Sequence, residues 1–110
     1  MLRPQHRLRA SAEILETLRH GTRFRLPYCD IYTYPLPSGE LVRVACIVGK
    51  RVHASSVVRH AIQRRLRAAC SALIPMINGP YRIVIVVSNG VVLDVDFQQL
   101  MSDIYYGIHY

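Results

Sequence analysis

Residues 55–74 carry an apolar pattern that strongly limits what this chain can fold into. The apolar side chains recur at spacings of three and four residues, the period of a helix with one buried side: Val58, Ile62, Leu66, Ala69 and Leu73. Ser55 or Ser56 can cap the start of this helix, and Pro75 supplies its end. The pattern therefore predicts a long helix whose apolar side packs on a sheet.

The opposite side of the same helix is rich in arginine. Arg59, Arg64 and Arg67 share the outward surface with His60 and Gln63, whereas Arg65 lies beside the apolar stripe and can lean over the helix edge. Guanidinium groups stay charged and offer planar sets of donors that fit phosphate oxygens. This face is either a contact for an RNA or DNA backbone or an ordinary solvated helix surface.

The distribution of charge favours a polyanionic partner. The chain has 110 residues, 51% of them hydrophobic, which is enough for one domain with a core, residues 1–110. Its net charge is +7, and the eight basic residues between Leu41 and Leu93 face no acidic residue in that stretch. A field concentrated in this way attracts nucleic acid or an anionic membrane.

Several classes of protein are disfavoured by what the chain contains. Its three cysteines, Cys29, Cys46 and Cys70, are odd in number and too far apart for a zinc site or a disulfide framework, so we expect buried thiols in a reducing cytosol. The basic start MLRPQHRLR has no apolar segment after it that resembles a signal peptide, and no apolar run approaches membrane-spanning length. We therefore predict a cytoplasmic protein without zinc and without a membrane partner.

The first third of the chain predicts a helix and one or two strands. A helix capped by Ser11 should end before Gly21, with Ile14, Leu15 and Leu18 facing inward and Gly21 in the left-handed conformation. Residues 22–34 look extended, with a break or an edge position at Pro27. Alternation then places one set of side chains on a common face: Tyr28, Asp30, Tyr32 and Tyr34. These tyrosines form either a platform on which unpaired bases stack or a half-buried surface under a helix.

The remaining elements complete an α/β order. The turn at residues 35–39 predicts an antiparallel hairpin between the strands on either side of it, residues 22–34 and 41–49. Residues 81–87 are too continuously apolar for an exposed strand and should lie in the middle of the sheet. Asp94 or Asp96 can cap a final helix whose inner stripe is Phe97, Leu100, Met101, Ile104 and Ile108. The order is αβββαβα, or αββαβα if residues 22–34 form one strand.

Taken together, these segments resemble the bacterial ribonuclease P protein subunit over nearly the whole chain. The resemblance is carried by VRVACIVGKRV, VVRHAIQRRLRAA and YRIVIVV, with RLR and RHGTRF before them and an acid-capped helix after them. In the family's R-N-R motif, Arg59 matches the first arginine, while His60 and Ala61 replace the other two residues. The family's fold implies a two-layer α/β sandwich with a left-handed crossover through residues 55–74.

The resemblance also implies a function and a set of residues. The family's protein assists a catalytic RNA, which carries its own Mg²⁺ and cuts the 5′ leader from precursor tRNA, so the partners would be ribonuclease P RNA and precursor tRNA. The protein would then hold no catalytic residue, metal or cofactor of its own. Residues expected to bind the catalytic RNA are Lys50, Arg51, Arg59, His60, Arg64, Arg65 and Arg67. Residues expected to line the cleft for the single-stranded leader are Ile14, Leu18, Tyr28, Tyr32 and Tyr34. Ile14 and Leu18 stand where the family often has phenylalanine.

Two other functions fit parts of the sequence. A self-sufficient nuclease would use a pair among the histidines to move protons, namely His6, His20, His53, His60 and His109. These lie in different predicted elements with no common spacing. A non-enzymatic ribosomal or assembly protein that binds structured RNA agrees with the charge pattern equally well.

Overall fold

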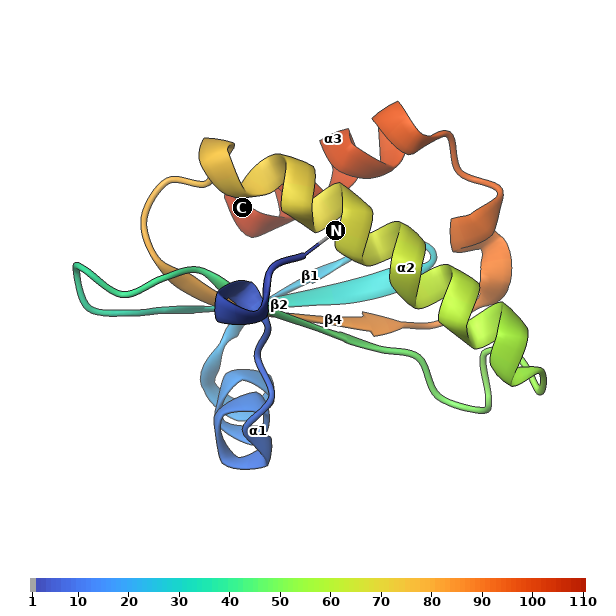
Figure 1. Ribbon diagram of the computed structural model, residues 1–110, viewed down its shortest axis with the longest axis horizontal. Coiled ribbons are helices and arrows are strands. Elements are labelled where there is room, and N and C mark those ends of the chain that lie inside the picture. Colours follow the sequence, from blue (N-terminus) through green and yellow to red (C-terminus); the bar gives the residue numbers. More distant parts are fainter. Residues whose placement is uncertain (1) are drawn as a thin grey trace.

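The computed structural model describes residues 2–110, and its element order confirms the prediction αβββαβα. The helices and strands are α1 (Ser11–His20), β1 (Thr22–Arg25), β2 (Cys29–Pro35), β3 (Arg43–Ile47), α2 (Ser56–Leu73), β4 (Tyr81–Val87) and α3 (Phe97–Ile108). Three short 3₁₀ turns accompany them: η1 (Pro4–His6), η2 (Ile74–Met76) and η3 (Gly90–Leu93). Figure 1 shows α2 and α3 on one face of the sheet and α1 on the other, so α1 adds a partial third layer to the expected two.

The sheet has four strands in the order β1-β2-β4-β3. β2 is antiparallel to both β1 and β4, and β3 is parallel to β4. The predicted hairpin between residues 22–34 and 41–49 is therefore wrong, because β4 lies between β2 and β3. The hairpin that does form joins β1 to β2, across the break predicted at Pro27.

β4 occupies the middle of the sheet, as its apolar sequence predicts. Ile83, Val84 and Ile85 are each 0% exposed, since strands cover both edges of β4 and helices cover both of its faces. The chain passes from β3 to its parallel neighbour β4 through α2, which makes this connection a crossover. Its left-handed sense stays a prediction from the resemblance.

The main core lies between the sheet and the helix pair α2 and α3. The apolar stripe predicted for α2 points into it, with Ile62, Leu66 and Ala69 each 0% exposed. Ser55 caps α2, because its hydroxyl accepts a hydrogen bond from the Val58 N–H at 3.4 Å. In α3 the inner residues Leu100, Ile104 and Ile108 are buried, and Asp96 is the residue that caps this helix.

The inner side of α1 differs from the prediction. Leu15, expected to face inward, is 49% exposed, while Thr17 is fully buried and its hydroxyl donates to the Glu13 carbonyl at 2.8 Å. Gly21 follows the helix in an extended conformation, with φ −75° and ψ 164°, and not in the left-handed one. A glycine is needed there for space: a Cβ atom would lie 2.5 Å from the Thr17 carbonyl oxygen and 2.7 Å from that of Thr33.

All three cysteines are buried free thiols, which confirms the prediction that they act as small apolar residues. Burial raises the pKa of the Cys29 thiol to about 12. A hydrogen bond with Cys46, together with burial, raises the pKa of the Cys70 thiol. Over residues 2–110, no helix is long and apolar enough to cross a membrane.

Candidate nucleic-acid interface

The outer face of α2 carries charge that no acidic group neutralises. His60 and Arg64 are exposed there, and Arg59 and Arg67 are partly exposed. In the part of the chain that the structure describes, every ion pair belongs to an arginine of the sheet: Arg23, Arg25, Arg43 or Arg82. The α2 arginines are therefore free of carboxylate partners and available to an external anion. We call Arg59, Arg64 and Arg67 the arginine face.

Two of the α2 arginines are partly engaged with the protein itself. Arg59 donates through Nη1 to the carbonyls of His53 and Ala54, each at 2.9 Å, and so ties down the loop that leads into the helix. Arg65 leans over the helix edge, as its position beside the stripe predicts. It donates to the Val95 carbonyl, and its guanidinium carbon lies 5.6 Å from the centre of the Phe97 ring.

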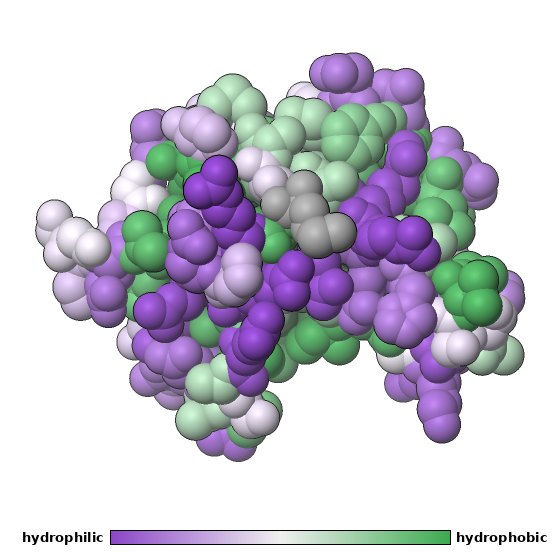
Figure 2. Space-filling model, in the orientation of Figure 1, coloured by the Kyte–Doolittle hydropathy of each residue, from purple (hydrophilic) through white to green (hydrophobic). Residues whose placement is uncertain are grey.

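The basic surface extends beyond α2 to segments that come earlier in the chain. Lys50 and Arg51 are exposed in the turn that follows β3. Arg7 and Arg9 lie beside β3, because the Leu8 N–H donates to the Val44 carbonyl at 2.9 Å and holds the N-terminal segment along that edge strand. Figure 2 shows strongly hydrophilic side chains gathered across the middle of this face.

The contribution of Arg7 and Arg9 was not predicted from the sequence. The basic start of the chain argues against a signal peptide, and its RLR, residues 7–9, is part of the family resemblance, but no RNA contact follows from the sequence for either arginine. Leu2 and Leu8 were the available signal, since they are 1% and 5% exposed and fix the segment to the molecule. Leucines before and after Arg7 indicate a segment that packs against the rest of the protein.

The opposite face of the sheet, which α1 partly covers, carries two of the three tyrosines of the predicted platform. Tyr32 and Tyr34 are partly exposed, and their neighbours on β4 are Val84 and Arg82. The guanidinium carbon of Arg23 lies 5.9 Å from the centre of the Tyr32 ring. Tyr32 thus offers an aromatic surface beside a cation, whereas the Tyr34 ring is contacted by Arg82, with 5.3 Å between the guanidinium carbon and the ring centre.

Tyr28 does not belong to this platform, and its predicted place beside Tyr32 is wrong. It precedes the first residue of β2, and its side chain is only 3% exposed within the main core. Its hydroxyl donates to a carboxylate oxygen of Asp103 on α3 at 2.6 Å, which holds the ring on the other face of the sheet. A ring buried in this way offers no surface to a base.

Ion pairs fix α1 to the sheet. Arg82 of β4 is paired with Glu16 and, at 3.4 Å, with Glu13, while Arg43 of β3 lies 3.9 Å from Glu13. The Arg82 side chain is only 14% exposed, so this contact is partly shielded from solvent. These pairs hold the helix that carries Ile14 at a set position above the strands.

A hollow of about 410 Å³ opens between α1, the N-terminal segment, β3 and α2. Its lining includes Ile14 from the predicted leader cleft, Ala45 and Ile47 from β3, and the basic residues Arg9 and Arg67. Ala45 on β3, Val84 on β4 and Tyr32 on β2 lie next to one another across three adjacent strands. Ala45 and Tyr32 are therefore separated by two strand spacings, roughly 10 Å. Leu18, also predicted for the cleft, is partly buried on α1 but does not line this hollow.

The histidines lie in different parts of the fold: His20 ends α1, and His60 belongs to α2. His6 contacts the Val42 carbonyl at 2.7 Å, His53 accepts from the Ser55 N–H, and His109 accepts from the Asn78 N–H. Each of these last three rings thus contacts backbone groups in a different region. Within residues 2–110, no group of three or more His, Cys, Asp or Glu side chains is arranged to hold a metal ion.

Comparison with known proteins gives one consistent family. A family model described as Ribonuclease P matches residues 2–108. The ribonuclease P protein component of Pseudarthrobacter chlorophenolicus is 40% identical over 72 residues, 66% of this chain and 52% of that protein, so the alignment spans about half of that relative. The component of Mycobacteroides abscessus is 33% identical over 113 residues, which cover 94% of this chain and 87% of that protein.

Solved structures of two such proteins share the fold. The RNase P protein of Staphylococcus aureus matches with a TM-score of 0.78 at 16% identity, over 94% of this chain and 93% of that one. The RNase P protein of Thermotoga maritima matches with a TM-score of 0.77 at 16% identity, over 93% of this chain and 94% of that one.

Proposed function

Because the chain belongs to the bacterial ribonuclease P protein family, we propose that it assists the catalytic RNA of ribonuclease P in removing the 5′ leader from precursor tRNA. In this proposal the protein has two RNA surfaces. One binds the catalytic RNA, and the other receives the single-stranded leader. The chemistry belongs to the RNA, and the protein adds affinity and position.

The surface for the catalytic RNA is the arginine face of α2, extended by Lys50 and Arg51 and by Arg7 and Arg9. The observation that carries this assignment is that, among the described residues, these side chains have no carboxylate partner, whereas the sheet arginines do. A guanidinium without a partner gains most from a phosphate, since no internal ion pair has to be broken first. His60 lies exposed on the same face and can approach the RNA with them.

The surface for the leader is the open part of the sheet beside α1. Ile14 forms one wall, Ala45 and Ile47 form an apolar floor, and Tyr32 lies two strands farther along that floor. Apolar and aromatic surface bounded by cations suits a single strand, because bases stack on rings while phosphates meet the basic rim. Tyr34 lies two residues farther along β2, beside Arg82, which is itself paired with Glu13 and Glu16.

The placement of the acidic side chains supports a catalytic RNA as the carrier of Mg²⁺. Glu13, Glu16 and Asp30 are paired with arginines. Asp103 accepts from Tyr28 and Gln99, and Asp96 caps α3. Hard cations need several oxygen ligands at one point, and these carboxylates are committed to separate structural roles.

A reconstitution experiment tests the proposed function. Purified protein is added to the ribonuclease P RNA of the same cell at low Mg²⁺, and cleavage of precursor tRNA is followed. We expect cleavage to rise steeply with protein concentration and to need both components. Specific binding to ribosomal RNA, with no stimulation of ribonuclease P RNA, would instead support the ribosomal or assembly protein that the charge pattern alone permits.

A further inference from the structure

A second hollow, of about 450 Å³, lies between α2 and the start of α3 and shares Arg7 and Arg67 with the first. Its lining residues are Arg7, Arg64, Arg65, Arg67, Ala68 and Phe97. The lining thus combines four guanidinium groups with one aromatic ring and contains no carboxylate. Its volume falls within the range of about 300 to 1,000 Å³ that is usual for sites of small molecules.

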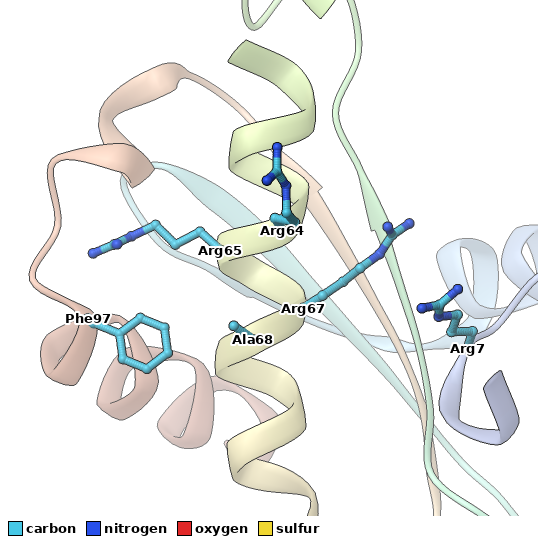
Figure 3. A pocket seen from close by; sticks show the side chains of 6 residues that line it. All are labelled: Arg7, Arg64, Arg65, Arg67, Ala68 and Phe97. Carbon is cyan, nitrogen blue, oxygen red and sulfur yellow. The ribbon is translucent and has the colours of Figure 1, made fainter. Parts of the chain in front are cut away.

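The two sides of this hollow differ in chemistry, as Figure 3 shows. Arg65 extends toward α3 and Phe97, whereas Arg67 extends from the other side of the helix toward Arg7. Ala68 lies between them, and its small side chain leaves the floor open. One side is therefore a flat surface made of a guanidinium and an aromatic ring, and the other is a cluster of cations, of which Arg7 also donates to the Leu2 carbonyl at 3.0 Å.

The flat side is held in place by the protein. Arg65 donates to the Val95 carbonyl, and its guanidinium carbon lies 5.6 Å from the centre of the Phe97 ring. Phe97 itself packs against the main core. A fixed guanidinium plane beside a fixed ring forms a preorganised surface for stacking, because little freedom is lost when a planar group binds.

We infer that this hollow holds one unstacked nucleotide of the catalytic RNA, with its base against Arg65 and Phe97 and its phosphate toward Arg67 and Arg7. A nucleotide joins a planar base to an anion, and the hollow presents a stacking surface and a cluster of cations on its two sides. A phosphate alone would leave the aromatic side unused, and an apolar ligand alone would leave the cations unused. This inference rests on the proposed function and adds a base contact to a surface otherwise described by phosphate contacts.

The decisive variant is Ala68→Leu, which fills the floor of the hollow without changing any charge. Stacking of one base is worth roughly 1 to 3 kcal/mol, so affinity for the catalytic RNA should fall by between about 5-fold and 100-fold. The dependence of affinity on salt should stay unchanged, because the larger side chain displaces only the base and leaves the phosphate in contact with Arg67 and Arg7. Ala72→Leu is the matched control: it makes the same change on α2 at an exposed position outside the hollow, and affinity should be unaffected.

A second variant separates loss of stacking from a steric clash with the RNA. Phe97→Leu keeps the hollow open and apolar but removes the ring, and it should also weaken binding at an unchanged salt dependence. If both variants act on the same nucleotide, the double variant should cost little more than Ala68→Leu alone. Fully additive losses would overturn the inference, since they would indicate two unrelated effects.

Base-specific chemical probing of the complex identifies the occupant. We expect one unpaired base to be protected by the wild-type protein and to become reactive with Ala68→Leu. Adenosine 5′-monophosphate at millimolar concentration should not compete with the RNA. Competition by it, without any protected base, would assign the hollow to a free nucleotide and overturn the inference.

The outcomes also separate this inference from the proposed function. Unchanged affinity in Ala68→Leu and Phe97→Leu, with weaker binding in Arg64→Ala, would refute the nucleotide site and leave the arginine face intact. Unchanged affinity in all three variants, with no stimulation of cleavage, would refute both.

Discussion

Tyr28 combines a ring in the apolar core with one hydrogen bond to a carboxylate on α3. Its ring lies in the core, and its hydroxyl donates to Asp103, an acceptor that Gln99 also contacts. We predict that Tyr28→Phe lowers the free energy of unfolding by about 2 kcal/mol, because a hydrogen bond to a charged acceptor is lost and the carboxylate stays partly buried. Urea unfolding at pH 7 measures the difference.

The same hydroxyl should give this difference a dependence on pH. Burial and the contact with Asp103 raise the pKa of Tyr28 well above its ordinary value of 10.0. The contribution of the hydroxyl to the free energy of unfolding is therefore complete below pH 10. It is lost as the pH rises further, because the tyrosine of the unfolded chain releases its hydroxyl proton at a lower pH than that of the folded protein. By pH 11 the difference in free energy of unfolding between wild type and Tyr28→Phe should be smaller than at pH 7 by about 1.4 kcal/mol. A difference that stays constant up to pH 11 would contradict this account.

Tyr32 is the residue on which the proposed leader contact depends. We predict that Tyr32→Ala weakens binding of precursor tRNA by roughly 1 to 3 kcal/mol and leaves the affinity for mature tRNA nearly unchanged, because only the leader reaches the ring. Titration of the holoenzyme with both ligands measures this. Tyr32→Phe keeps the ring and should bind like the wild type. An equal loss for the two ligands would show that the ring serves only the structure.

At the scale of elements, α2 concentrates the proposed contacts with the catalytic RNA. We predict that replacing Arg59, Arg64 and Arg67 by Ala lowers the salt dependence of log affinity by about two units, since each lost phosphate contact contributes roughly 0.7 to 0.9. The helix should remain folded, because these side chains lie outside the apolar stripe and Ala favours helix. If the triple variant is folded and its salt dependence is unchanged, the arginine face makes no contact with the RNA and is only a solvated helix surface.

Arg65 should behave differently from its neighbours on α2. Its guanidinium lies beside the Phe97 ring and donates to the Val95 carbonyl, so it links α2 to α3. We predict that Arg65→Ala lowers the free energy of unfolding by about 1 kcal/mol, because both the stem and the contact with the ring are lost. Arg64→Ala, an exposed change one residue away, should leave stability unchanged and is the control.

The helices were predictable from sequence because their period is local. The stripe from Val58 to Leu73 and the cap at Asp96 depend on residues within a few turns of one another. Pairing of strands is not local, and adjacency in the chain led to the wrong partner for β3. The apolar run of β4 indicated a central strand, but nothing in it showed that β2 and β3 would lie on its two sides.

The candidate site was predictable where one element carries it and not where several meet. Arg59, Arg64 and Arg67 followed from the helical period. Arg7 reaches the same surface only through the pairing of Leu8 with Val44, and Phe97 only through the packing of α3 on α2. Tyr28 was misplaced because alternation along a strand assumes that the strand has already begun, and β2 begins at Cys29.

For the whole molecule, the arrangement of charge points to a division of labour with the RNA. Five of the carboxylates are paired with arginines, cap a helix or accept hydrogen bonds, namely those of Glu13, Glu16, Asp30, Asp96 and Asp103, and the histidines lie in different parts of the fold. We predict that the purified protein without RNA leaves precursor tRNA intact at millimolar Mg²⁺, because over residues 2–110 no group of His, Cys, Asp or Glu side chains is arranged to hold a metal ion that would activate water. Cleavage that survives removal of all RNA and is lost in a histidine variant would contradict this.

The central position of β4 also bears on how the chain acquires this structure while it is being synthesised. β2 and β3 leave the ribosome before β4, and neither pairs with the other. Until residue 87 has emerged, β3 has no neighbouring strand and the apolar side of α2 has no complete sheet to cover. A nascent chain that stops before Tyr81 therefore has the arginines but not the scaffold that orders them. The RNA surface should form in one step, once β4 has been made and lies between β2 and β3.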